Sequence, residues 1–180
     1  EVMFYGMSSL TSLDLSNFDT SQVKYMDYMF SYMSSLTTLD LSNFDTSQVA
    51  YMNSMFSGTS LTSLNLSNFD TSKVMKMSNM FFNMRNLTSL NLTNFNTSKV
   101  TDMEDMFSLS NDYASDDKLE KIYVNNDFDT SKLTAFSNMF RNRKKLRGGN
   151  GSYLANPSTA DKTWLRVDRP GVQGYFTRKP

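Results

Sequence analysis

The sequence predicts an α/β repeat fold: a solenoid in which each repeat adds one short parallel strand and one short helix, with a C-terminal cap. A unit of 25 or 26 residues recurs and opens each time with L-T-[ST]-L-[DN]-L-[ST]-N-F-[DN]-T-S. Within the unit the apolar spacing changes from alternation to steps of three and four residues, and a Met-Phe pair follows. The regular copies open at Leu10, Leu36, Leu61 and Leu87.

The opening L-x-x-L-x-L segment predicts the strand. In the first copy Leu13 and Leu15 alternate with Asp14 and Ser16, which places the leucines inward and the polar residues outward. One strand and one short helix cannot bury their apolar faces alone. Equivalent strands are therefore expected to pair at about 4.8 Å and to stack like residues into ladders.

The segment that begins at D-T-S predicts the helix. Asp19 is a favourable N-cap residue, and Gln22 stands three positions later, as in a capping box. The apolar residues from Val23 to Met33 form one stripe of a helix of about three turns. The equivalent N-cap residues are Asp45, Asp70, Asn96 and Asp129.

Aromatic and sulfur-containing side chains are expected to fill the interior between the two layers. Methionine suits irregular slots because its side chain is unbranched and flexible. An exposed, methionine-rich binding groove is the alternative interpretation. One phenylalanine per copy forms a predicted interior column: Phe18, Phe44, Phe69, Phe95 and Phe128.

Both ends of the chain depart from the regular unit. Met3-Phe4 matches the later Met-Phe pairs, so the chain is expected to begin inside a truncated first repeat. A diverged fifth copy opens at Leu119, after a polar segment, 108–118, that is expected to be an exposed loop. We therefore predict a solenoid over residues 1–147 and a capping segment over residues 148–180. The cap would cover the open end with Trp164, Leu165, Val167, Tyr175 and Phe176.

Composition excludes several kinds of site. The chain has no cysteine and no histidine, which rules out a Cys/His zinc site, a cysteine nucleophile and a Ser-His-Asp triad. No apolar run approaches the roughly 18 residues of a membrane-spanning helix, so no membrane insertion is expected from this chain.

The net charge of zero hides an asymmetry. Residues 1–140 hold 8 Lys/Arg and 16 Asp/Glu, whereas residues 141–180 hold 10 Lys/Arg and 2 Asp. A basic run at the end of the fifth copy is one candidate binding surface, for an anionic polysaccharide or an acidic partner. Its alternative interpretation is a solvated helix end, where cations suit the helix dipole. The run comprises Arg141, Arg143, Lys144, Lys145 and Arg147.

The outward positions of the strands form a second candidate surface. Asp14 and Asp40 would lie about one strand spacing apart and repel each other. Calcium could relieve that repulsion, while solvent and salt are the alternative, and no other cofactor is expected. Few aromatic residues on this polar face argue against a tight sugar site. The predicted ladder is Asp14, Asp40, Asn65, Asn91 and Tyr123.

The whole unit, L-x-x-L-x-L followed by V-x-x-M-x-x-M-F, resembles the BspA-like leucine-rich-repeat proteins. In particular it resembles the Met-Phe branch of mycoplasma surface lipoproteins and of lactobacillus and enterococcus surface proteins. The resemblance covers residues 1–147 and implies a curved leucine-rich-repeat solenoid. It also implies an extracellular position on a bacterial surface, with signal and anchor outside this chain, and adhesion to host or matrix. The fifth copy departs from the pattern at Lys121, Tyr123 and Phe136, which puts a continuous ligand surface in doubt there.

Residues and resemblance together predict a binding module and not an enzyme. The expected partners are a host or matrix protein, mucin, or a cell-surface or cell-wall glycan, and the chain is expected to be monomeric. Nucleic acid is not expected, because the acidic repeats would repel phosphate. A stalk that displays another domain is the alternative function, and a polysaccharide-active enzyme comes third because the Ser/Thr/Asn ladders offer no converging ionisable groups.

Overall fold

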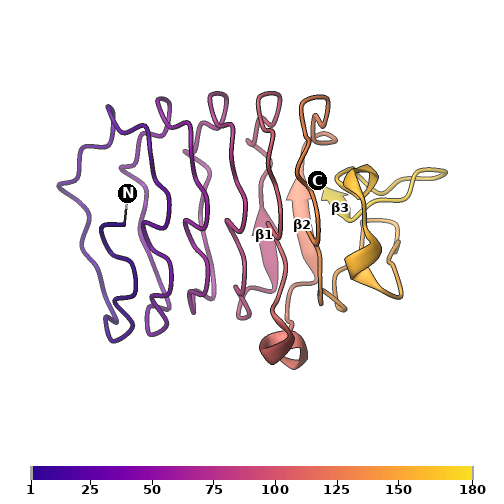
Figure 1. The fold of residues 1–180 in the computed structure, drawn as a ribbon, viewed down its shortest axis with the longest axis horizontal. Helices are drawn as coiled ribbons and strands as arrows, with labels where there is room; N and C mark the ends of the chain where they lie inside the picture. Colours follow the sequence, from indigo (N-terminus) through magenta and orange to yellow (C-terminus); the bar gives the residue numbers. More distant parts are fainter. Residues whose placement is uncertain (1, 180) are drawn as a thin grey trace.

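The computed structural model describes residues 2–179 as a row of similar coils stacked along the long axis of the molecule (Figure 1). Strands β1 (Ser89–Asn91), β2 (Lys121–Val124) and β3 (Phe176–Arg178) form a parallel sheet with β2 in the centre. In its register Leu90 lies beside Ile122, and Ile122 lies beside Phe176. The predicted strand is therefore hydrogen-bonded as a strand in the fourth and fifth copies only.

The helix predicted for each copy is wrong. In the described range the helices are short 3-10 segments: η1 (Asn111–Asp116), η2 (Pro157–Thr159) and η3 (Lys162–Trp164). The segment after D-T-S is instead a run of turns, in which Met29 N donates to Met26 O and Ser31 N to Tyr28 O. Tyr28 has φ of 58° and Tyr32 has φ of 59°, and such left-handed residues interrupt an α-helix. The three-residue apolar steps come from successive turns.

Main-chain hydrogen bonds between coils run along this turn segment. Met26 N donates to Tyr51 O at 2.9 Å, and Tyr28 N donates to Asn53 O at 2.9 Å. Alternate residues of every regular copy donate to the following coil in the same way. The turn side thus carries the continuous parallel ladder that the sequence analysis assigned to the leucine side.

On the leucine side of the first copies, side chains link the coils. Asn68 Nδ2 donates to Leu41 O at 2.9 Å and to Phe44 O at 2.8 Å, and Asn43 and Asn94 make equivalent bonds. These amides satisfy main-chain carbonyls at the bend that follows each leucine segment. A buried threonine ladder, Thr20, Thr46, Thr71 and Thr97, continues the linkage.

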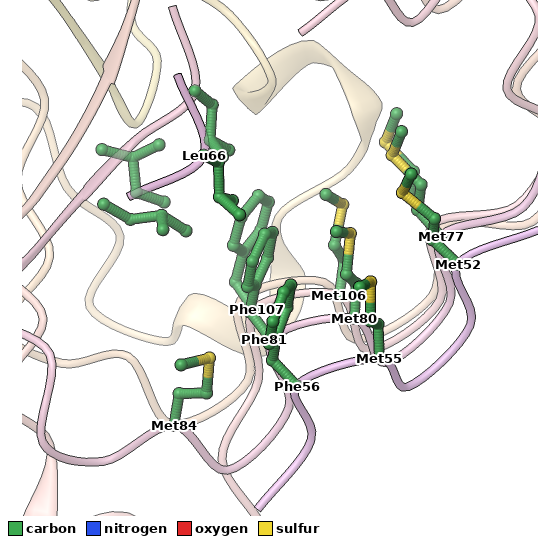
Figure 2. Close-up of a cluster of buried hydrophobic side chains, with 14 of the residues drawn as sticks. Met52, Met55, Phe56, Leu66, Met77, Met80, Phe81, Met84, Met106 and Phe107 are labelled. Atoms are coloured by element: carbon green, nitrogen blue, oxygen red, sulfur yellow. The ribbon is translucent and has the colours of Figure 1, made fainter. Parts of the chain in front are cut away.

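The centre of the core is a column of phenylalanines from the Met-Phe pairs (Figure 2). Phe30, Phe56 and Phe81 stack nearly parallel, with ring centroids 5.8 and 6.1 Å apart. The other phenylalanine of each copy tilts against this column, as Phe44 does on Phe30 at 6.1 Å. Of the phenylalanines predicted to form the interior column, Phe44, Phe69 and Phe128 are buried but tilt against other rings, whereas Phe18 is 37% exposed at the first coil. The continuous stack is formed by the Met-Phe pairs.

Methionine columns flank the aromatic column (Figure 2). Met52, Met77, Met55 and Met80 are fully buried. The core interpretation of the methionines is confirmed, and the exposed-groove alternative is wrong for these residues.

The segment after residue 147 packs across the last coil. Phe176 contacts Phe128 with ring centroids 4.7 Å apart, and Tyr175 contacts Phe140 at the same separation. Gly148 is required here, since a Cβ at this position would collide with Gly174 O and the side chain of Asp168. The boundary at residue 147 itself stays a prediction.

Acid should destabilise the stack through its turn carboxylates. The backbone N–H groups of Ser21 and Ser47 hydrogen-bond Asp19 and Asp45 and hold the pKa of each carboxyl below its ordinary 3.8; Asp14 and Asp40 behave alike. The charged form is favoured in the folded state, so this stabilisation is complete above the ordinary pKa. It is lost as pH falls through the lowered values. We expect a melting temperature that declines below about pH 4.

Thermal unfolding followed by circular dichroism between about pH 7 and pH 2 measures the effect. Asp45→Asn is the matched variant, because Asn96 accepts the equivalent bond from Ser98 N in the fourth copy. In this variant the melting temperature should fall less as the pH is lowered, and stability at neutral pH should be unchanged. A melting temperature that does not change with acid would contradict this assignment.

Candidate binding surfaces

Arg143 was expected on the basic surface, and this expectation is wrong. Its side chain is 1% exposed and forms an ion pair with Asp117, with Nη1 3.1 Å from Oδ1. Its other nitrogens donate to Phe107 O and Met84 O. Burial lowers the pKa of the guanidinium, and the adjacent Asp117 carboxylate opposes that change. Arg143 therefore ties three coils together and presents no charge to solvent.

The four other cations of the predicted run have different environments. Arg141 Nη2 lies 2.9 Å from Asp105 Oδ1 and is partly neutralised by it. Arg147 lies over the Tyr153 ring, with its Cζ 4.3 Å from the centroid. Lys144 and Lys145 are exposed. The run thus leaves Lys144 and Lys145 available to a ligand, whereas Arg147 is held by the Tyr153 ring and by the carbonyls of Lys144 and Leu146.

The structure joins these cations to residues from earlier copies. A hollow of about 310 Å³ is lined by Glu120, Lys121, Lys144, Lys145 and Arg147. Lys145 also lines a second hollow of about 430 Å³, whose other walls are Arg85, Asn86, Ser115, Asp116, Asp117 and Lys118. We call these two hollows together the basic surface.

Sequence reasoning missed Arg85, Lys118 and Lys121 as parts of this surface. The repeat register contains the necessary information. Asn86, Lys118 and Lys145 each precede the leucine that opens or matches the opening of a unit, so they occupy one position on neighbouring coils. In the first three copies Ser9, Ser35 and Ser60 stand there, so charge appears only in the later coils.

The outward residues of the leucine segments bind their own backbone. Asp14 Oδ1 accepts from Ser16 N and Asp40 Oδ1 from Ser42 N, each at 2.9 Å. Asn65 and Asn91 accept in the same way from Ser67 N and Thr93 N. These hydrogen bonds from Ser16 and Ser42 hold the pKa of both aspartates below its ordinary value. The fifth member of the ladder, Tyr123, lies half-buried on β2.

Carboxylates elsewhere serve structural contacts. Glu104 accepts a hydrogen bond from Ser137 Oγ, and Asp105 accepts from Ser108 Oγ and Arg141. Within residues 2–179 no group of three or more acidic residues is placed to hold a metal ion. The same range includes no helix long and apolar enough to cross a membrane.

Exposed tyrosines were not predicted as part of a binding surface, because the repeat pattern placed the candidate ladder on the leucine side. Tyr5, Tyr25, Tyr28 and Tyr32 are exposed on the turn side of the first two coils. Tyr25, Tyr28 and Tyr32 stand within the Val23–Met33 segment that was predicted to be helical.

Comparison with known families identifies the chain at the family level. A family model described as "Mycoplasma protein of unknown function, DUF285" matches residues 1–86 and 60–163. No curated protein and no solved structure matched the chain. The two matches span most of the sequence, so the chain belongs to the DUF285 family of Mycoplasma proteins of unknown function.

Proposed function

We propose that the stack of coils is a leucine-rich-repeat solenoid of the BspA-like kind that acts as an adhesion module on a bacterial surface. Its ligand is an anionic glycan of the host, the matrix or the cell wall, bound at the basic surface. Membership of a Mycoplasma repeat family and the Met-Phe unit support the location and the class. The observation that carries the ligand is the convergence of cations from neighbouring coils on two adjoining hollows.

The form of the basic surface suits a polymer. Both hollows are open to solvent and share Lys145, so a polymer can meet the charged groups one after another along its chain. Asp116 and Glu120 lie among the cations, and the hydroxyl groups of a sugar can donate hydrogen bonds to their carboxylates. Binding of this kind weakens as salt screens the charges.

The test measures binding of the chain to heparin as a sulfated probe, and to mucin and teichoic acid, with and without calcium. Lys144→Glu/Lys145→Glu should weaken heparin binding by at least about tenfold and reduce its salt dependence. Lys24→Glu/Lys99→Glu changes the net charge by the same amount at two exposed lysines elsewhere and should leave binding nearly unchanged. Equal losses in both variants would reject the basic surface.

A stalk is the second candidate, favoured by the uninterrupted main-chain ladder through the regular coils. It predicts no saturable binding by this chain to any of these probes. Turnover of a glycan by the purified chain would reject both proposals in favour of an enzyme.

A further inference from the structure

Three tyrosines form an exposed cluster at the opposite end of the molecule from the basic surface. Tyr5 lies between Tyr28 and Tyr32, with ring centroids 6.2 and 5.8 Å away and both rings nearly perpendicular to its own. The three side chains are between 42% and 51% exposed. Each ring is therefore packed along an edge and still open to solvent.

Two of these tyrosines occupy backbone positions that disfavour them. Tyr28 and Tyr32 have left-handed φ, where a bulky side chain is unusual. The equivalent residues with left-handed φ in other copies are small or polar: Ser54, Asn79, Asp105 and Asn138 for Tyr28, and Gly6, Gly58, Asn83 and Asn142 for Tyr32. An aromatic side chain kept at an unfavourable backbone position indicates a use for the ring.

The neighbouring coil makes room for one of the rings. The Tyr32 ring lies over Gly58, where a Cβ would be 2.8 Å from its Cδ1. Gly58 itself has φ of 68°, so its glycine serves both the turn and the ring. The Tyr32 ring thus packs on the neighbouring coil, yet the residue is 45% exposed. Because the packing already restricts the side chain, less conformational entropy is lost when a ligand binds.

The coils that carry the tyrosine cluster have a net negative charge. Residues 2–60 carry five aspartates and one lysine, Lys24, and Asp27 is next to Tyr28 in the chain. A polyanion would be repelled here, and a cation would be attracted both by the carboxylates and by the electron-rich ring faces.

The chain uses tyrosine–cation pairs internally at its other end. Arg85 lies 4.4 Å from the Tyr113 centroid, and Arg147 lies 4.3 Å from that of Tyr153. Among the described residues, such cations are recorded over Tyr113, Tyr153 and Phe136, and none over the cluster. From this charge complementarity we propose that Tyr5, Tyr28 and Tyr32 form a docking surface for an arginine- or lysine-rich segment of a partner protein.

The test titrates the full chain with a short arginine-rich peptide and with a glutamine peptide of equal length. Tyr28→Asn/Tyr32→Gly removes two rings without changing charge and installs residues found at the same positions in other coils, so it should melt no lower than the original chain. We expect it to bind the arginine peptide about tenfold more weakly. Tyr153→Asn, at an exposed tyrosine already covered by Arg147, should leave binding unchanged.

Several results would overturn the proposal. If the double variant binds the arginine peptide as tightly as the original chain does, general electrostatic attraction suffices. If the original chain binds the glutamine peptide as tightly as the arginine peptide, the surface does not recognise a cation. Stronger tyrosine-dependent binding of choline, or of a neutral glycan, would assign the cluster to a different ligand. Concentration-dependent self-association that disappears in the double variant would make a second copy of the chain the partner.

Discussion

Replacing Arg143 with methionine is expected to lower the free energy of unfolding by about 3–5 kcal/mol. The substitution keeps an unbranched side chain and removes the charge that neutralises buried Asp117. It also leaves the carbonyls of Phe107 and Met84 without the donors that reach them now. A single buried carboxylate without its cation is costly, whereas the intact pair is roughly balanced against its own desolvation.

Guanidinium unfolding followed by circular dichroism measures this loss. Lys144→Met is the control, since it makes the same change at the adjacent exposed residue and should alter stability by less than about 0.5 kcal/mol. Arg143→Met/Asp117→Leu should be less destabilised than Arg143→Met, because the unpaired charge is then absent. If Arg143→Met behaves like Lys144→Met, the buried ion pair does not hold these coils together.

Truncating one ring in the middle of the aromatic column is the second large effect. Phe81→Ala should lower the free energy of unfolding by about 3–5 kcal/mol, through lost burial and the cavity that remains. Phe81 is 1% exposed and stacks on Phe56 at 6.1 Å and on Phe107 at 5.8 Å, so two coil interfaces lose contact at once. Relaxation is limited because the coils are also fixed by their main-chain ladder.

Phe82→Ala provides the comparison for this prediction. Phe82 is the next residue and is only partly buried, so its removal should cost clearly less than that of Phe81. The same unfolding experiment applies, and proteolysis adds a spatial test. A weakened interface between coils should expose cleavage sites near residues 56–107 before the C-terminal end. Similar stabilities for the two variants would contradict a central role for the column.

The sequence predicted the repeat, its register and most of its interior, because periodic burial leaves a direct trace in residue spacing. The parallel pairing of Leu90 with Ile122 follows from that register across an insertion of variable length. The helix was wrong for a local reason. Steps of three residues fit either helices or successive turns, and the deciding residues are those with left-handed φ. Gly58, Asn79 and Asn83 favour turns, but Tyr28 and Tyr32 conceal the rule in the first regular copy.

The candidate site was harder to predict because it depends on partners from distant segments. The partner of Arg143 is Asp117, which stands at the end of the inserted loop and could have been solvated equally well. Pairing of Lys118 with Lys145 across neighbouring coils is readable from the register, yet a run of adjacent charges drew attention to residues 141–147. Positions compared between copies are better guides to a repeat surface than clusters along the chain.

Because each regular coil donates the same N–H groups to the next, the interface between neighbours does not depend on how many coils there are. Whole units can therefore be gained or lost by recombination while every remaining junction keeps its geometry. Such events would lengthen or shorten the distance between the tyrosine cluster and the basic surface in fixed steps. Variants with different numbers of coils would then differ in the spacing of these two surfaces and not in the chemistry of either one.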